Sequence, residues 1–305
     1  MSPSPQVQAL FERALLAQRR RRACALGRVT FLIDRVAEDM AERLSAVRRT
    51  FDVVVDLGTP TDAVRRAILA GGAVERIVAA APTIVAREEQ TPLVLADEER
   101  LPFRDASLDV VVSGLALQFV NDLPGALVQI RRALKPDGLF LAALIGGDTL
   151  TELRQAFAAA EAEIEGGVSP RVAPFADVRT MGALMQRTGF ALPVTDVDHV
   201  CVRYDSPLRL MQDLRRMGAT NVLAERRRGV LRRQTLKRLI EIYAERFADP
   251  DGRVRASFDI IWLSGWAPHE SQPQPLRPGS ARMRLAEALG TRELSAGEKP
   301  NEKPQ

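Results

Sequence analysis

The sequence is poor in the residues that support several common functions. Its 305 residues include two cysteines, two histidines and four lysines, and aromatic residues make up 5%. Cys24 and Cys201 form no CxxC pair, so neither a disulfide framework nor a cysteine-based metal site is expected. His199 and His269 lack the HxD or HxE pattern of a facial triad, and His199 is expected to be structural. We therefore expect no metal, and the scarcity of cysteine fits the reducing cytoplasm best.

Long apolar runs are also missing, and none approaches the roughly 18 to 20 residues that cross a bilayer. The net charge of +4 arises from basic residues interleaved with 39 acidic ones. With so few aromatic residues to stack on bases, no nucleic-acid partner is expected. The sharpest basic cluster, RRRR at 19–22, also has the composition of a targeting presequence. Because FLIDRVAEDMAERL follows it like the next helix of one domain, we favour a folded pair of N-terminal helices.

What the sequence does contain is an alternation of strand and helix patterns. The clearest helix is NDLPGALVQIRRAL, where Asn121 or Asp122 can cap the start. Short, nearly continuous apolar runs are typical of strands buried on both faces of a parallel sheet. They lie at 51–56, 76–81, 92–96, 108–117 and 138–145. This βαβ succession predicts an α/β fold with a doubly wound sheet.

The pattern changes after residue 148, where Thr149 and Glu152 can form a capping box that opens a helix. Two further strands are predicted at 190–204 and 257–268, with the latter antiparallel to its neighbour. We expect helices over 1–50, an α/β domain over 51–204 and 256–270, a helical lid over 205–255, and an extended or disordered tail over 271–305. A lid in that position would cover the carboxyl ends of the strands, where ligands bind in open α/β sheets.

The order of these elements resembles the class I S-adenosylmethionine-dependent methyltransferases, whose sheet has seven strands with the last one antiparallel. LADEERLPFRDASLDVVVSGLAL, EGGVSPRVAPF, MQDLRRMGATN and GWAPHESQPQPLRPGSA more narrowly resemble bacterial relatives of mitochondrial complex I assembly factor 5. That family is described both as methyltransferases and as arginine hydroxylases of a core complex I subunit. The carrier-protein methyltransferase of biotin synthesis is more distantly similar. The resemblance implies a Rossmann-type, mostly parallel sheet of seven strands, S-adenosylmethionine as the cofactor, and a protein partner such as a respiratory complex I subunit.

The resemblance places the cofactor at FDVVVDLGTPTDAVRR. In the methyltransferase pattern D-x-G-x-G-x-G, the glycines let the backbone turn and approach the methionine part of the cofactor. Asp56 and Gly58 keep this pattern, whereas Pro60 and Asp62 replace the later glycines. Proline lacks an N–H donor, and the aspartate adds a negative charge beside the carboxylate of the ligand. We therefore expect weak binding, with a dissociation constant of about 10 μM or poorer.

A second departure lies at the end of the second strand, where class I methyltransferases carry an acidic residue for the ribose hydroxyls. RIVAAAPT offers none, and losing such a charge-assisted hydrogen bond costs about 1.5 to 3 kcal/mol. The adenine side is retained, because Asp97 and Glu98 follow the third strand. Together with Asp56, Gly58 and Ser113, they are the cofactor-binding residues that the resemblance implies. Alternatively, Asp56 and Gly58 form only a tight turn.

Three functions remain open. The first is an S-adenosylmethionine-dependent transferase that acts on a protein or a carrier-bound group, and the second is an arginine hydroxylase of a complex I subunit. The third is an assembly factor without catalysis, which the altered glycine loop favours. The sequence does not identify catalytic residues. For a substrate or partner, we expect Met217 and Asn221 to line a cleft opposite the strand end that carries Trp266 and His269, with arginines at its rim.

Overall fold

The computed structural model describes residues 9–82, 91–273 and 290–291. The chain divides into two units, residues 1–269 and 270–305, and the sheet lies entirely in the first. The tail expected from residue 271 onward lies almost wholly outside the described residues.

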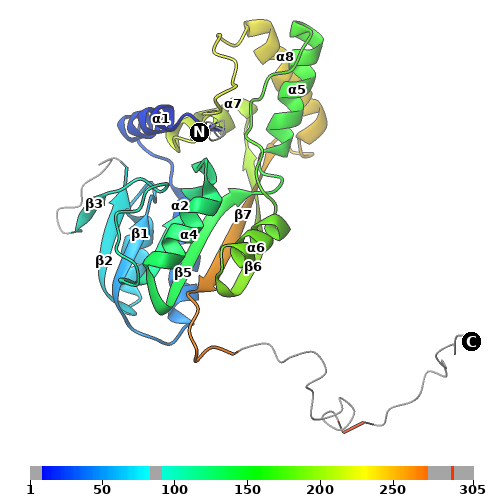
Figure 1. Ribbon diagram of the computed structural model, residues 1–305. Coiled ribbons are helices and arrows are strands. Elements are labelled where there is room, and N and C mark those ends of the chain that lie inside the picture. The colour runs from blue at the N-terminus through cyan, green and yellow to red at the C-terminus, as the bar shows by residue number, and fades with distance from the viewer. Residues whose placement is uncertain (1–8, 83–90, 274–289, 292–305) are drawn as a thin grey trace, which may run out of the picture. The chain divides into compact units, whose positions relative to one another are not determined.

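A seven-stranded sheet with the order β3-β2-β1-β4-β5-β7-β6 forms the centre of the first unit (Figure 1). The first five strands pair in parallel, and β7 runs antiparallel to both β5 and β6. The predicted doubly wound, mostly parallel sheet and its antiparallel late strand are therefore confirmed. The strands are β1 (Phe51–Leu57), β2 (Val74–Ala81), β3 (Leu93–Leu95), β4 (Leu108–Gly114), β5 (Leu134–Gly146), β6 (Ala191–Tyr204) and β7 (Val254–Trp266).

Helices pack on both faces of this sheet because β1, β4 and β5 are apolar on both sides. On one face, α2 (Phe31–Ser45) and α3 (Ala63–Ala70) bury their apolar stripes against the sheet. On the other face, α4 (Leu123–Ala133) and α6 (Val178–Arg187) do the same. The side chain of Asp122 caps α4 by accepting a hydrogen bond from the Gly125 amide at 2.9 Å, so of the two predicted caps, Asn121 and Asp122, the second is formed.

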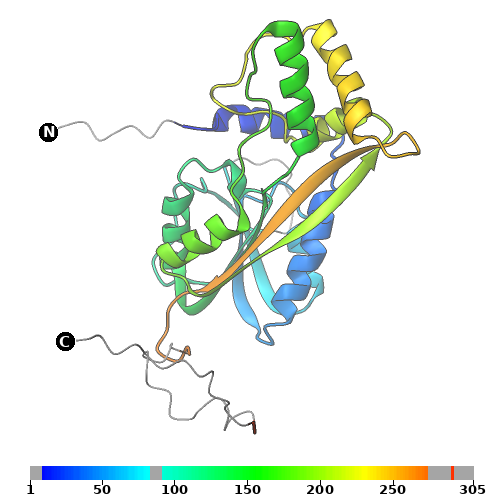
Figure 2. The ribbon, with the colours of Figure 1, turned by 90° about the vertical axis from the view of Figure 1, so that its right-hand side faces the viewer.

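Four helices gather beyond the carboxyl ends of the parallel strands. They are α1 (Arg13–Ala25), α5 (Thr151–Glu165), α7 (Pro207–Arg216) and α8 (Arg233–Phe247). α5 and α8 lie side by side, and α1 lies against α7 (Figures 1 and 2). The 205–255 segment therefore shares this layer with α1 and α5. Within the described ranges, no helix has both the length and the apolar character that crossing a bilayer requires.

The start of α5 differs from the prediction. The Thr149 hydroxyl donates to the Gly146 carbonyl at 2.7 Å and accepts from the Asp259 amide at 2.8 Å. Glu152 accepts hydrogen bonds from the amide and the hydroxyl of Ser257, at 3.1 and 2.6 Å. Neither residue caps the helix, so the predicted capping box is wrong. Both side chains instead attach α5 to the neighbouring strand β7.

The segment GGDTL (146–150) is further held by a carboxylate from β7. Asp259 Oδ2 accepts a hydrogen bond from the Asp148 amide at 2.8 Å, and Asp259 Oδ1 lies 2.7 Å from His199 Nδ1. The hydrogen bond and charge of Asp259 raise the pKa of His199 above its ordinary value. This histidine joins two strands, in agreement with its expected structural role.

This pair predicts a small dependence of stability on pH. The folded-state pKa of His199 is raised. The contribution of its protonated ring to the stability of the fold is therefore fully present below the unfolded-state pKa and is lost as the pH rises through the folded-state pKa. The His199 side chain is 72% exposed, so solvent limits the contribution to about 0.2–1 kcal/mol. Urea unfolding should show His199→Gln less stable than wild type at pH 5.5 and nearly equal to it at pH 8.5. An equal difference in stability between wild type and His199→Gln at the two pH values would contradict this pH dependence.

Candidate functional site

The turn after β1 is built around a buried ion pair. Asp56 is 1% exposed, and its Oδ2 lies 2.6 Å from Arg65 Nη1 on α3. The Thr59 hydroxyl donates a hydrogen bond to the same carboxylate. Burial raises the pKa of Asp56, while Arg65 and Thr59 oppose that rise. Gly58 has φ +72°, which suits glycine. The carboxylate of Asp56 therefore holds the strand-to-helix turn together.

An arginine from α1 contacts the acidic residues that follow β3. Arg13 Nη2 lies 3.0 Å from Asp97 and forms an ion pair with Glu98, and its Nη1 lies 3.2 Å from Glu99. The buried Glu98 side chain lies against Gly58 so closely that a Cβ at that glycine would overlap its carboxylate. The structure thus brings three of the expected cofactor residues, Gly58, Asp97 and Glu98, to one place. In this arrangement the carboxylates of Asp97 and Glu98 contact Arg13 of α1.

The remaining features of the expected cofactor site have structural partners. The Ser113 hydroxyl donates to the Leu57 carbonyl at 2.7 Å, which links β4 to β1. Asp62 pairs with Arg66 at 3.0 Å on the surface of α3, and it does not line the cavity described next. Its expected repulsion of a ligand therefore has no basis in this arrangement. β2 ends in three alanines, Ala79 to Ala81, so no acidic side chain is present there.

A cavity of about 360 Å³ lies at the carboxyl ends of β1, β4 and β5. Pro60, Leu115 and Ile145, which follow or end these three strands, form its floor. Residues of α1, α5 and α7 and of the segment 171–175 form its walls, and most of the lining is apolar. This volume lies within the range of small-molecule sites, about 300 to 1,000 Å³. The cavity adjoins the turn after β1, where the methionine part of the cofactor was expected.

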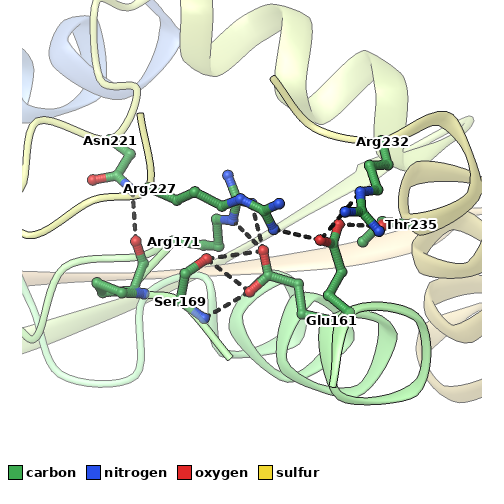
Figure 3. A network of polar contacts seen from close by, with 9 residues as sticks. Glu161, Ser169, Arg171, Asn221, Arg227, Arg232 and Thr235 are labelled. Carbon is green, nitrogen blue, oxygen red and sulfur yellow. Dashed lines mark hydrogen bonds and ion pairs between the residues drawn. The ribbon is translucent and has the colours of Figure 1, made fainter. Parts of the chain in front are cut away.

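One wall of the cavity is held by a buried polar network (Figure 3). Glu161 on α5 is fully buried and accepts hydrogen bonds from the amide and hydroxyl of Ser169 and from Arg171. Glu165, one turn later, pairs with Arg227 at 2.6 Å and accepts from the Thr235 hydroxyl at 2.6 Å. Two carboxylates of α5 thus attach the segments before α6 and before α8 to this helix.

The four residues expected to face one another across a cleft lie at two different edges of the sheet. Met217 and Asn221 line the cavity at the carboxyl edge. Asn221 is also engaged in structure, because its amide donates to the Pro170 carbonyl at 2.7 Å. Trp266 pairs with Leu139 near the start of β5, and His269 follows it at that amino edge. The expected cleft between the two pairs is therefore not formed.

The sequence interpretation missed the contribution of α1. Arg20 and Ala23 of α1, and Phe11 just before it, line the cavity, and Arg13 contacts the acids after β3. A usable signal was present, because Leu16, Arg20 and Ala23 are spaced four and three apart and so share one helix face. An arginine between two apolar residues of one face is a candidate for burial. Among the described residues, no group of three or more His, Cys, Asp or Glu side chains is placed to hold a metal ion.

Comparisons with known proteins identify relatives along most of the chain. It is 36% identical to the mitochondrial arginine-hydroxylase NDUFAF5 of Danio rerio, over 93% of this chain and 91% of that protein. With the human protein of the same name the identity is 37%, over 94% of this chain and 85% of that protein. Malonyl-[acyl-carrier protein] O-methyltransferase of Laribacter hongkongensis is 35% identical, over 86% and 89% of the two chains.

A methyltransferase-domain family model matches residues 55–142. Among solved structures, YcgJ from Bacillus subtilis aligns with a TM-score of 0.51 at 16% identity, over 75% of this chain and 98% of that one. At that identity the likeness shows the fold alone, and it agrees with the class I methyltransferase architecture. The relatives also correct one expectation. The cytoplasmic location inferred from the scarcity of cysteine is contradicted, because the NDUFAF5 proteins are mitochondrial.

Proposed function

Because the chain belongs to the family of the arginine-hydroxylase NDUFAF5 proteins and has a methyltransferase fold, we propose that it is an S-adenosylmethionine-dependent transferase. Its substrate would be a group carried by a protein or by a carrier protein. The observation that carries the proposal is the cavity beside the turn after β1, at the sheet edge where ligands bind in open α/β folds. The methyltransferase relative that acts on a carrier-bound malonyl group supports the same substrate class.

The residues at the carboxyl edge fit one half of this cofactor. The cavity offers an apolar floor and arginine side chains near the turn after β1, which suits the amino-acid end of the cofactor. The adenosine end has no acid at the end of β2, and Asp97 is paired with Arg13. The Glu98 carboxylate lies directly against Gly58, in the space that a side chain at this glycine would fill. Tight binding of the adenosine end would require Glu98 to move, which agrees with the expectation of weak affinity.

Calorimetric titration of the full chain with S-adenosylmethionine tests the proposal. The wild type should bind with a dissociation constant of about 10 μM or poorer. Asp97→Ala should weaken binding about tenfold, since a hydrogen bond to a charged group contributes about 1.5–3 kcal/mol. Glu98→Ala should tighten it, because the carboxylate that covers Gly58 is removed while Arg13 keeps two acidic partners.

Glu99→Ala is the matched control, because Glu99 also pairs with Arg13 but does not lie against Gly58. Its affinity should stay close to that of the wild type. Sub-micromolar binding by the wild type would show that the altered glycine loop was overrated. If Glu98→Ala weakens binding, Glu98 contacts the cofactor as the sequence first indicated, and its position over Gly58 is not an obstacle.

A second candidate is a protein that assists respiratory complex I assembly without methyl transfer, with a complex I subunit as its partner. Arg13 favours it, because this side chain engages both acids of the expected adenine site, Asp97 and Glu98, and the adjacent Glu99. The name of the NDUFAF5 relatives adds arginine hydroxylation of such a partner as a further alternative. Affinity purification of the tagged chain from its host, together with the titration, separates these options. Recovery of a complex I subunit without any cofactor binding would favour the assembly role.

A further inference from the structure

The charged side chains around the cavity all have one sign. Arg20, Arg28, Arg171 and Arg216 contribute to its lining, and no aspartate or glutamate does so among the described residues. The rest of the lining is mainly apolar, with phenylalanine, leucine, isoleucine, valine and methionine side chains. In such surroundings a positive charge is weakly screened, so it acts strongly on any charged group that enters. The cavity therefore favours anions.

Three of these four arginines have a partner within the protein. Arg171 forms an ion pair with Glu161 in the network described above. Arg28 donates to the Pro60 carbonyl, and Arg216 Nε donates to the Gly27 carbonyl at 2.7 Å. Carbonyl groups are neutral, so they satisfy a donor without cancelling its charge. Of these three arginines, only Arg171 therefore has its positive charge neutralised by a described residue, Glu161.

Arg20 differs from the other three. It is 8% exposed, and the structure gives its guanidinium neither a hydrogen bond nor an ion pair with any described residue. Its contact is with the Phe119 ring, whose centroid lies 5.9 Å from the guanidinium carbon. At this distance a cation–π contact is near its outer limit of about 6 Å. Burial lowers the pKa of Arg20, and the charge of Glu98 opposes that shift.

The backbone holds Arg20 in this position. Gly218, just after α7, has φ +74°, and a Cβ there would lie 3.1 Å from Arg20 Cα. The glycine thus lets α7 approach α1 closely. Arg19, the preceding residue of α1, donates to the Thr220 hydroxyl at 2.7 Å and fixes the same contact. The segment MGATN therefore positions the α1 arginine at the cavity.

We propose that Arg20 is the binding residue for the carboxylate of a ligand whose apolar part fills the cavity. An unpaired buried charge is costly, and a carboxylate is the planar anion that the guanidinium binds with two parallel hydrogen bonds. The carboxylate could belong to the amino-acid end of S-adenosylmethionine or to a second ligand with an apolar chain. The inference stands on the lining of the cavity and does not require that cofactor.

Two pairs of probes, each with and without a carboxylate, test the assignment by calorimetry on the full chain. S-adenosylhomocysteine is compared with 5′-methylthioadenosine, and decanoate with decanol. For at least one pair, Arg20→Met should weaken binding of the carboxylate at least tenfold and leave the neutral member within about threefold, because hydrogen bonds to charged groups contribute about one to two decades. The pair that responds identifies the source of the carboxylate. Arg20→Lys should retain part of the affinity.

Arg216→Met is the matched control, because Arg216 lines the same cavity and has a backbone partner. It should change carboxylate affinity much less than Arg20→Met does. The midpoint of thermal unfolding of ligand-free Arg20→Met should not fall, since the substitution removes a buried charge that has neither a hydrogen bond nor an ion pair with a described residue to lose. The assignment is overturned if Arg20→Met weakens both members of each pair equally, or if neither carboxylate binds the wild type more tightly than its neutral counterpart.

Discussion

Replacing Arg65 with methionine should lower the free energy of unfolding by about 3–5 kcal/mol, the usual cost of breaking a buried ion pair from one side. Arg65 and Asp56 are both buried, and the substitution leaves the Asp56 carboxylate with Thr59 as its remaining side-chain partner. Chemical denaturation followed by circular dichroism at pH 7 measures the loss. Arg66→Met is the matched control, because Arg66 lies on the exposed side of the same helix. Its effect should stay below about 1 kcal/mol.

The pH dependence of this variant identifies the cause. Burial raises the pKa of Asp56, and without Arg65 the value should rise further. A carboxyl group whose folded-state pKa is raised favours folding when it is protonated, so the stability of Arg65→Met should increase as the pH falls through that value. The double variant Asp56→Asn with Arg65→Met should recover much of the loss at pH 7. If it is as unstable as Arg65→Met, lost packing of the arginine stem explains the effect and the unpaired charge does not.

Glu161→Gln should also lower the free energy of unfolding by about 3–5 kcal/mol. The substitution keeps the size of the side chain but removes the charge that pairs with Arg171, whose side chain is 15% exposed. Although burial alone would raise it, the Ser169 amide and Arg171 hold the pKa of Glu161 below its ordinary value. The contribution of the ionised Glu161 to the free energy of unfolding is therefore present above the unfolded-state pKa and is lost as the pH falls through the folded-state pKa. The difference between wild type and variant should shrink in acid.

Glu163→Gln provides the comparison for this prediction. Glu163 lies on the same helix, and its ion pair with Arg238 has an N–O distance of 2.6 Å, similar to the contacts of Glu161. Its side chain is 45% exposed, so solvent and salt weaken the pair, and the loss of stability should be much smaller than that of Glu161→Gln. Equal losses in the two variants, measured by urea denaturation, would show that the burial of Glu161 does not set its contribution.

The sheet could be predicted because its strands are short apolar runs separated by polar turns. Each predicted strand overlaps an observed one, and the cap of α4 was identified because aspartate three residues before a free amide is a local signal. The capping box at Thr149 and Glu152 was also a local signal. It failed because β7 offers both side chains hydrogen-bond partners that are distant in sequence. A local pattern cannot reveal such competition.

The placement of Trp266 and His269 failed for a different reason. β7 was correctly expected to run antiparallel, and the end of an antiparallel strand lies at the edge where the parallel strands begin. The direction of β7 alone was therefore enough to place these two residues away from the ligand edge. The role of α1 was harder to predict, because the spacing of Leu16, Arg20 and Ala23 indicates which arginine shares an apolar face but not what that face packs against. Packing against α7 and Phe119 decides that Arg20 faces inward.

The charged side chains of the cavity come from parts of the sequence outside the shared methyltransferase domain. Residues 55–142, which match the methyltransferase-domain model, supply Pro60 and Leu115 of the cavity floor but none of the four arginines. Arg20 and Arg28 precede that stretch, and Arg171 and Arg216 follow it. Substitutions outside the shared domain can therefore reverse the charge that a ligand meets while the sheet and its turns stay unchanged. Two proteins with equally good domain matches can thus differ in the ligands they accept.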